Sequence, residues 1–341
     1  MCDRRIGHTP YESSFRLFIM KPIASLSLDL DNKWSYMKTH GDAGWDTFPT
    51  YLDVIVPRAL SFFKERNLDI TFFIVGQDAA LEKNRESIAS IATAGHEVGN
   101  HSFNHEPWLH LYSKAELIEE FEKTEAALLD VTGKRPVGFR GPGYSLSPTV
   151  LEVLAERGYK YDCSTLPTYI APLARAYYFF KSPEMSVEER EKRKKLFGKF
   201  SDGFRSLKPY SWQVGDSSLI EIPVTTFPVL KTPIHASYLL YLSTFSLIAA
   251  RNYWKMALRM CRMTGIQPSI LLHPLDFMNG EDVPELKFFP AMNIPIDQKL
   301  ALISEIVGEL DAKFSIKTMK EHARSLADKP VKVLDYEKQP A

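Results

Sequence analysis

Apolar segments of strand length alternate with helical patterns about seven times along the chain, and this alternation constrains the fold more than any other feature. The first strand is expected at residues 23–31, where apolar and polar side chains alternate with a period of two. Apolar runs at residues 70–75 and 270–273 have the length of buried strands. Repeated strand–helix units predict an α/β fold with a parallel sheet and helices outside it, built as a barrel or as a doubly wound sheet.

The helical segments between the strands carry start and stop signals. Ser113 and Glu116 form the pattern of a capping box, and Gly133 is placed to end the helix that follows. Ser147 with Pro148 begins another helix, because proline is favoured in a first turn. Shorter strands are expected to end at Asn100, Arg140, Asp162 and Pro223.

The sequence predicts a single domain between two tails. Residues 22–326 form the α/β domain, and residues 1–21 and 327–341 are the tails. The connection at residues 166–216 is longer than the others and contains a charged run at residues 188–195. We expect an insertion or lid beside the site there, since charge runs of this kind are usually solvated.

Composition excludes several classes of protein. Lys+Arg and Asp+Glu both total 42 in 341 residues, so the zero net charge argues against nucleic acid as a partner. Cys2, Cys163 and Cys261 are far apart, which disfavours a disulfide framework and favours a reducing compartment. The apolar run near the N-terminus is too short for a signal peptide, whether translation starts at Met1 or Met20. A cytoplasmic location is therefore expected.

Acidic and histidine residues gather at predicted strand ends, where parallel α/β folds place functional groups. Asp29 and Asp31 lie two residues apart on one strand and share a face, so their repulsion calls for a cation or a shared proton. His101 and His105 follow the strand that ends at Asn100. Two histidines and one carboxylate, with positions left for water, are the ligands of a hydrolytic metal site.

Three further strand ends carry polar residues. Arg140 stands in the segment Arg140-Gly-Pro-Gly-Tyr144 and would hold a neighbouring carboxylate ionised. Asp162 ends another strand, and His273 ends the apolar run 270–273. Taken singly, each also fits an ordinary structural role as a surface arginine, a capping aspartate or a core histidine.

The order of these motifs resembles the polysaccharide deacetylase family, carbohydrate esterase family 4. The motifs D-x-D, H-S-x-x-H, R-x-P-G-Y, a strand-end Asp and L-x-H follow one another between residues 23 and 273. The resemblance implies the fold of that family, a distorted (β/α)7 barrel, for residues 22–326 with the insertion at residues 166–216.

The resemblance also implies roles for the residues on the first strands. Asp31, His101 and His105 match the ligands of a divalent metal, which is usually zinc. Asp29 matches the base that deprotonates the attacking water, and Arg140 matches the arginine that pairs with this base. The family usually has adjacent aspartates, so the extra residue between them leaves the split of base and ligand between Asp29 and Asp31 open.

Other site residues follow from the later motifs. The backbone at Tyr144 would help to hold the oxyanion, His273 matches the general acid for the leaving amine, and Asp162 matches the strand-end aspartate of the fourth motif. Gly143 is an extra residue in the third motif, and Leu166 replaces the usual tryptophan of the fourth. The substrate is therefore left open.

The leading hypothesis is a metal-dependent hydrolase that removes the N-acetyl group from an amino sugar. One alternative is a hydrolase of a linear or cyclic amide that is not a sugar, such as an imide or a ureide. An alternative of another class is a sugar-binding barrel without catalysis. The absence of an export signal favours a lipid- or nucleotide-linked sugar as the substrate, and the oligomeric state is left open.

Residues 232–262 raise a separate question of membrane contact. Residues 232–250 contain no charged side chain, and the segment that follows places four cations on one helix face. We interpret the segment as an outer barrel helix with a solvated basic face. The alternative is peripheral contact with the inner face of a membrane. The four cations are Arg251, Lys255, Arg259 and Arg262.

Overall fold

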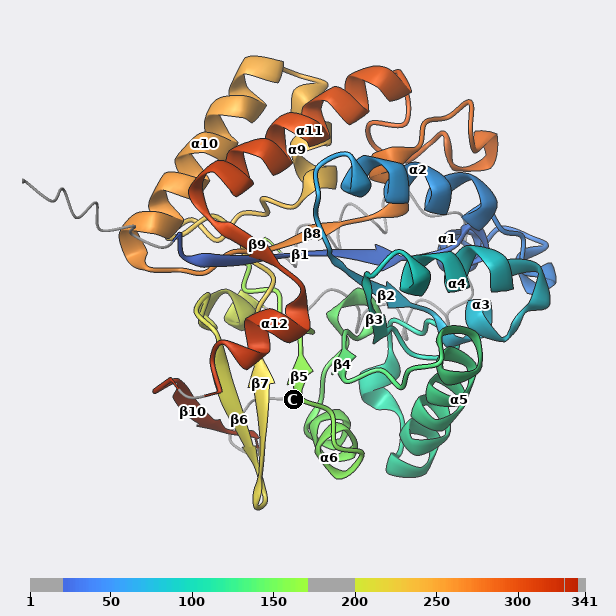
Figure 1. The fold of residues 1–341 in the computed structure, drawn as a ribbon, viewed down its shortest axis with the longest axis vertical. Coiled ribbons are helices and arrows are strands. Elements are labelled where there is room, and N and C mark those ends of the chain that lie inside the picture. Colours follow the sequence, from blue (N-terminus) through green and yellow to red (C-terminus); the bar gives the residue numbers. More distant parts are fainter. Residues whose placement is uncertain (1–20, 171–199, 328, 337–341) are drawn as a thin grey trace, which may run out of the picture.

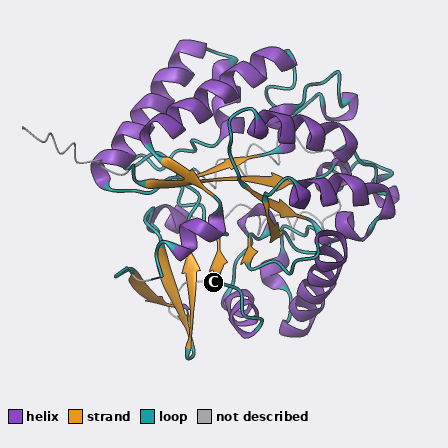
Figure 2. Ribbon diagram, viewed as in Figure 1, coloured by secondary structure: helices purple, strands orange, loops and turns teal. Residues whose placement is uncertain are grey.

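The computed structural model of the protein describes residues 21–170, 200–327 and 329–336, and it shows helices around a central sheet (Figures 1 and 2). The charged run at residues 188–195 and nearly all of the predicted N-terminal tail lie outside the described residues. Elsewhere strands and helices alternate along the chain as the sequence predicts.

Within the described residues, seven strands form the wall of a distorted barrel. β5, β4, β3, β2, β1 and β8 are neighbours in that order and run parallel, and β7 lies parallel to β5. The barrel closes just after β7, where the Thr225 N–H donates to the carbonyl oxygen of Ser269 at 2.9 Å. The predicted (β/α)7 barrel is thus confirmed. Its strands are β1 (Ile23–Leu30), β2 (Thr71–Ile74), β3 (Glu97–Asn100), β4 (Gly138–Phe139), β5 (Tyr161–Asp162), β7 (Ser217–Glu221) and β8 (Ser269–Leu272).

The first strand, β1, has a polar face and an apolar face. Along β1, Leu26 and Leu28 belong to the large apolar core between the strands and the outer helices. Ser27 and Asp29 point the other way, and both receive hydrogen bonds from Arg140 at the end of β4. The period of two on β1 therefore carries a carboxylate into the barrel.

Helices cover the outside of the barrel, and their ends follow the predicted signals. Ser113 caps α5 in a capping box with Glu116, and Gly133 ends the helix with a left-handed φ of 71°. Ser147 caps α6. The helices up to α6 are α1 (Lys33–His40), α2 (Leu52–Lys64), α3 (Gly76–Ala80), α4 (Arg85–Thr93), α5 (Lys114–Thr132) and α6 (Pro148–Glu156).

The remaining helices follow β7 in the sequence, and Figure 1 shows α9, α10 and α11 together on one side of β1 and β8. A short strand, β9 (Ser315–Lys317), follows α11 and precedes α12 in the sequence, and it pairs with β1. The bounds of these helices are α9 (Ala236–Ser243), α10 (Leu247–Thr264), α11 (Ile296–Lys313) and α12 (Met319–Arg324).

Two strands lie where the sequence predicts none. β6 (Tyr210–Val214), within the predicted insertion at residues 166–216, forms an antiparallel hairpin with β7 through a turn at Gly215 (φ 55°). β10 (Lys332–Asp335), within the predicted C-terminal tail, pairs with β6. Residues 210–214 of the predicted insertion and residues 332–335 of the predicted C-terminal tail therefore extend the sheet, while residues 171–199 of the insertion lie outside the described residues.

The predicted basic face of residues 232–262 contacts another helix. Arg251 Nε donates to Glu305 of α11 at 2.6 Å, and Lys255 Nζ lies 3.6 Å from a carboxylate oxygen of Glu309 on the same helix. Arg262 Nη1 donates to the carbonyl oxygen of Lys313 at 2.7 Å, so three of the four predicted cations have partners within the protein. No helix among the described residues combines the length and the apolar character that crossing a membrane requires.

Candidate metal centre and active site

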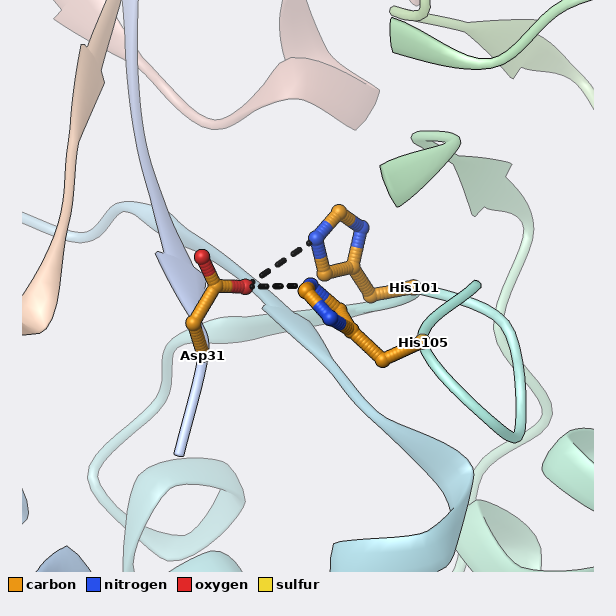
Figure 3. A group of neighbouring side chains, drawn as sticks. All are labelled: Asp31, His101 and His105. Atoms are coloured by element: carbon orange, nitrogen blue, oxygen red, sulfur yellow. Dashed lines mark ion pairs between the residues drawn. The ribbon is translucent and has the colours of Figure 1, made fainter. Parts of the chain in front are cut away.

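Asp31, His101 and His105 converge beyond the ends of β1 and β3 (Figure 3). Asp31 Oδ1 lies 2.9 Å from His105 Nε2 and 3.3 Å from His101 Nε2. One possible ligand atom of each residue lies within 4.8 Å of the other two. The structure therefore brings together the three metal ligands that the sequence predicts.

The start of α1 fixes Asp31 in place. Asn32 directly after it is the N-cap of α1, and its side chain accepts a hydrogen bond from the Lys33 N–H at 2.8 Å. Asn32 Nδ2 also donates to the buried Asp78 at 2.7 Å. The Tyr51 hydroxyl donates to the carbonyl oxygen of Asp31 at 2.6 Å. The backbone around the carboxylate is thus held from both sides.

His101 is oriented by a hydrogen bond from its other ring nitrogen. Its Nδ1 lies 2.6 Å from the carbonyl oxygen of Arg140. Because a carbonyl oxygen only accepts, Nδ1 carries the proton, and the lone pair of Nε2 is directed to Asp31 and its surroundings. A ligating imidazole needs this arrangement.

The two histidines lie on a strained loop and not on a helix. Ser102 and His105 have left-handed φ angles of 61° and 52°, which residues other than glycine rarely adopt. The carboxylate of Glu120 on α5 stabilises this loop by accepting the backbone N–H of Phe103 at 2.8 Å and of Asn104 at 3.0 Å. A fixed turn therefore brings His101 and His105, which are four residues apart, to the same site.

The charges of the three side chains are strongly coupled. Burial alone would raise the pKa of Asp31, but His105 and His101 outweigh it and hold the pKa of this carboxyl well below its usual range. Burial likewise opposes the charged form of His101, while Asp31 and Asp29 raise its pKa above the usual value. Asp31 Oδ1 is buried, and its only partners among the described residues are these imidazoles. Two nitrogens and one oxygen fit a divalent metal.

Asp29 has a different partner. Arg140 Nη1 donates to Asp29 Oδ1 at 2.7 Å and to Ser27 Oγ at 2.9 Å, and Arg140 Nε donates to the carbonyl oxygen of Cys163 at 3.1 Å. Burial favours the neutral form of Arg140, but the charge of Asp29 outweighs it and raises the arginine pKa. The two carboxylates of β1 are therefore divided between an arginine and a histidine pair.

Tyr144 lies at the site, but its backbone does not fit the predicted role. The Tyr144 N–H donates to the carbonyl oxygen of Gly141 at 2.9 Å, because Gly143 (φ 58°) and Tyr144 (φ 61°) close a tight turn. The expected oxyanion contact from this backbone is therefore not available. Burial and the charge of Asp29 raise the pKa of the Tyr144 phenol, which leaves a protonated hydroxyl beside the carboxylates.

Asp162 lies beside a second buried carboxyl group. Its carboxylate accepts from the Ser164 hydroxyl at 2.6 Å and lies beside Glu221 of β7, its partner in register. Trp212 Nε1 donates to Glu221 at 3.0 Å. Burial raises the pKa of both carboxyl groups, and repulsion from Asp162 raises that of Glu221 further. Asp162 thus belongs to a buried acidic pair, and Ser164 connects it to the Gly141 N–H next to Arg140, so its role in the site stays a prediction.

His273, directly after β8, lies next to Asp29 of the neighbouring strand β1. Leu272 of β8 pairs with Leu28 of β1, so the next residues on the two strands, His273 and Asp29, are neighbours. His273 Nδ1 lies 3.1 Å from the Ser237 Oγ atom.

Tyr36 and the surroundings of His273 were missed by the sequence analysis. Burial raises the pKa of Tyr36, and the charges of Asp31, Asp276 and Asp29 add to this effect. Ser237 and Asp276 contact His273, but their only sequence signals are a helix start and a carboxylate three residues after a histidine.

Comparison with known proteins finds relatives for one part of the chain. Residues 41–161 match the polysaccharide deacetylase family. Over 120 residues the chain is 34% identical to the peptidoglycan deacetylase of Helicobacter pylori, a match that covers 35% of this chain and 40% of that protein. Over 147 residues it is 27% identical to a peptidoglycan-N-acetylglucosamine deacetylase of Bacillus cereus, covering 41% of this chain and 62% of that protein. The matches thus span less than two thirds of either relative.

Solved structures agree on the fold. A Mycobacterium smegmatis protein assigned to the polysaccharide deacetylases superimposes with a TM-score of 0.57 at 21% identity, over 94% of this chain and 99% of that one. Puue allantoinase superimposes with a TM-score of 0.55 at 16% identity, over 90% of each chain. At these identities the likeness concerns the fold alone. The chain is thus similar in sequence to the polysaccharide deacetylase family over residues 41–161, and it shares a fold with these two solved structures over at least 90% of its length.

Proposed function

We propose that the protein is a metal-dependent hydrolase that removes the N-acetyl group from an amino sugar. The observation that carries this proposal is the division of the two carboxylates of β1. Asp31 faces the two imidazoles, whereas Asp29 is paired with the buried Arg140. The deacetylases of peptidoglycan with which the chain shares sequence support an acetylated sugar as the substrate class.

The residues of the chain divide the work of amide hydrolysis. Asp31, His101 and His105 would hold the metal, with zinc preferred for this donor set, and the metal would polarise the acetyl carbonyl and lower the pKa of water. Asp29, ion-paired with Arg140, accepts the proton of the attacking water.

The remaining two groups act on the substrate. His273 gives a proton to the amine nitrogen as the carbon–nitrogen bond breaks. The Tyr144 hydroxyl is a donor available to the oxygen on which charge develops. Base and acid thus come from the neighbouring strands β1 and β8.

Acetate release from N-acetylated sugars tests the proposal. The protein is stripped with a chelator and assayed with and without added Zn²⁺ on chito-oligosaccharides, peptidoglycan fragments and nucleotide-linked N-acetyl sugars. We expect acetate only when metal is present. Ring opening of a cyclic imide or ureide without acetate release would favour the non-sugar alternative. Sugar binding in calorimetry without either reaction would favour the non-catalytic barrel.

A finer part of the proposal concerns the carrier of the sugar. The turn after α9 exposes Phe245 (72%), and the start of α10 exposes Leu247 (41%) and Ile248 (70%). These side chains, more than the partly neutralised basic face, support contact with a lipid-linked sugar at a membrane surface. Co-sedimentation with lipid vesicles should decrease in a Phe245→Ser/Ile248→Ser variant. Full binding by this variant, or no binding by the unmodified protein, contradicts the contact.

A further inference from the structure

The side of the site formed by β8 and the start of α9 holds a chain of three polar side chains. His273 Nδ1 lies 3.1 Å from the Oγ atom of Ser237, in the first turn of α9. The Ser237 hydroxyl is also hydrogen-bonded to the carboxyl group of Asp276, which is almost fully buried. The imidazole is thus connected through one hydroxyl to a buried carboxyl group.

The number of protons available determines the direction of the hydrogen bonds that join His273, Ser237 and Asp276. A hydroxyl has one proton to donate, and an ionised carboxylate only accepts. With Asp276 ionised, Ser237 donates to Asp276, and the oxygen of Ser237 accepts the Nδ1–H of His273. The tautomer with the proton on Nδ1 is then favoured. Nε2 is left as the nitrogen that takes up a proton and passes it on.

The loop that carries Asp276 is fixed independently of Ser237. Asp276 Oδ2 accepts the backbone N–H of His273 at 2.8 Å. The buried Lys299 of α11 donates to the carbonyl oxygens of Leu275 and Met278 at 2.7 and 2.6 Å. Burial raises the pKa of Asp276, whereas the charges of His273 and Lys299 act in the opposite direction. The carboxyl group is therefore placed without help from the serine.

Three titratable groups face His273 from the elements around it. Asp276 follows it on the same loop, Asp29 lies beside it on β1, and His235 precedes α9 with ring centroids 5.9 Å apart. Burial and the charge of His273 lower the pKa of His235 to about 3. His235 is therefore neutral at ordinary pH.

We infer that Ser237 and Asp276 are positioning residues that hold His273 as the proton donor for the leaving amine. The inference rests on the proposed function. When the tetrahedral adduct collapses, the carbonyl double bond forms again and the carbon–nitrogen bond breaks, with its electron pair going to nitrogen. His273 Nε2 delivers one proton to that nitrogen, so the products are acetate and the free amine. Ser237 and Asp276 transfer no proton to the substrate.

The leaving group distinguishes positioning from a merely structural role. The Ser237→Ala variant should lower kcat for an N-acetyl sugar about 10- to 100-fold with little change in KM, because an amine leaves only when protonated. The same variant should keep 4-nitrophenyl acetate hydrolysis within about twofold, because 4-nitrophenolate leaves without a proton. Ser237→Thr should restore most of the lost kcat. Ser243→Ala is the matched control, since Ser243 lies in the last turn of α9 and donates to the Leu240 carbonyl oxygen.

Parallel loss of both activities in Ser237→Ala, or unchanged N-acetyl sugar turnover, overturns the inference. Nitrogen-15 NMR of the imidazoles gives a second readout that needs no substrate, with His273→Gln to assign the signals. We expect neutral His273 to carry its proton on Nδ1 in the unmodified protein, and to be a mixture of the Nδ1–H and Nε2–H tautomers in Ser237→Ala. A proton on Nε2 in the unmodified protein contradicts the inference. Failure of the proposed function can be distinguished from failure of this inference, because in the first case the unmodified protein releases no acetate.

Discussion

The two sides of the site are built in different ways. The metal side, at the ends of β1, β3 and β4, consists of charged pairs: Asp31 with two histidines, and Asp29 with Arg140. The proton-donor side, at the end of β8, consists of the hydrogen-bonded chain from His273 through Ser237 to Asp276. A cation site needs fixed charges, whereas a proton donor needs one defined tautomer.

This difference predicts how each side responds to substitution. Removing one member of a buried charged pair leaves the other charge unpaired, which is costly. Removing a neutral hydroxyl such as that of Ser237 leaves no unpaired charge, and the imidazole of His273 is still present. We therefore expect losses on the metal side to be larger and to include the metal itself.

The largest effect is expected for the double variant His101→Ala/His105→Ala. It removes two of three ligands, so acetate release should fall by at least about 10⁴-fold and metal content should fall to background. Elemental analysis and the acetate assay measure the two losses. The control is His40→Ala, a histidine outside the metal ligands that pairs with Asp42. Equal metal content in the double variant and the unmodified protein would falsify the assignment of these ligands.

A smaller effect is expected where only the base is lost. Asp29→Asn should lower kcat roughly 10³-fold while metal stays bound, because its partner is Arg140. Asp31→Asn should lose metal as well as activity, because its partners are the imidazoles. Metal content and kcat of both variants thus decide the split of base and ligand. Loss of metal in Asp29→Asn together with retention in Asp31→Asn would reverse the two roles.

The barrel could be predicted from sequence because its signals are local. Apolar runs and capping residues mark β1, β8, α5 and α6, and the structure has these elements at the predicted positions. β6 and β10 were missed, because the pairing of Lys332 with Tyr210 joins distant parts of the chain. Only two of the four residues of β10 are even half-buried, so its sequence has no strong apolar pattern.

The site shows the same difference between residues with a local sequence signal and residues that meet only in the folded structure. The metal ligands and Arg140 stand at strand ends in recognisable motifs, and the structure brings them together. Ser237 stands at a helix start, where serine is common for local reasons, so its contact with His273 was not predictable. Asp162 shows the opposite case, because its motif position gives no sign that Glu221 is its neighbour.

Each side of the site also rests on a buried carboxyl group, and Asp78 allows the metal side to be tested through stability. Asp78 accepts hydrogen bonds from Asn32 and from Trp34, whose ring is 6.5 Å from that of His105. Burial outweighs these hydrogen bonds and raises the pKa of Asp78 to about 7. This is the metal-side counterpart of Asp276, whose pKa burial also raises.

The smallest expected effect is therefore a pH-dependent difference in the free energy of unfolding between Asp78→Asn and the unmodified protein. Folded Asp78 keeps its proton up to about pH 7, whereas the unfolded carboxyl loses it near its ordinary pKa of 3.8. Ionisation therefore destabilises the fold as the pH rises between these values. The asparagine variant lacks this penalty, and its stability relative to the unmodified protein should rise by about 2 kcal/mol from pH 5 to pH 7. Urea unfolding of the metal-free proteins at constant ionic strength measures it, with Asp53→Asn on the exposed face of α2 as the control. A difference that stays constant over this range, or falls, would show that Asp78 is already ionised in the folded protein at pH 5.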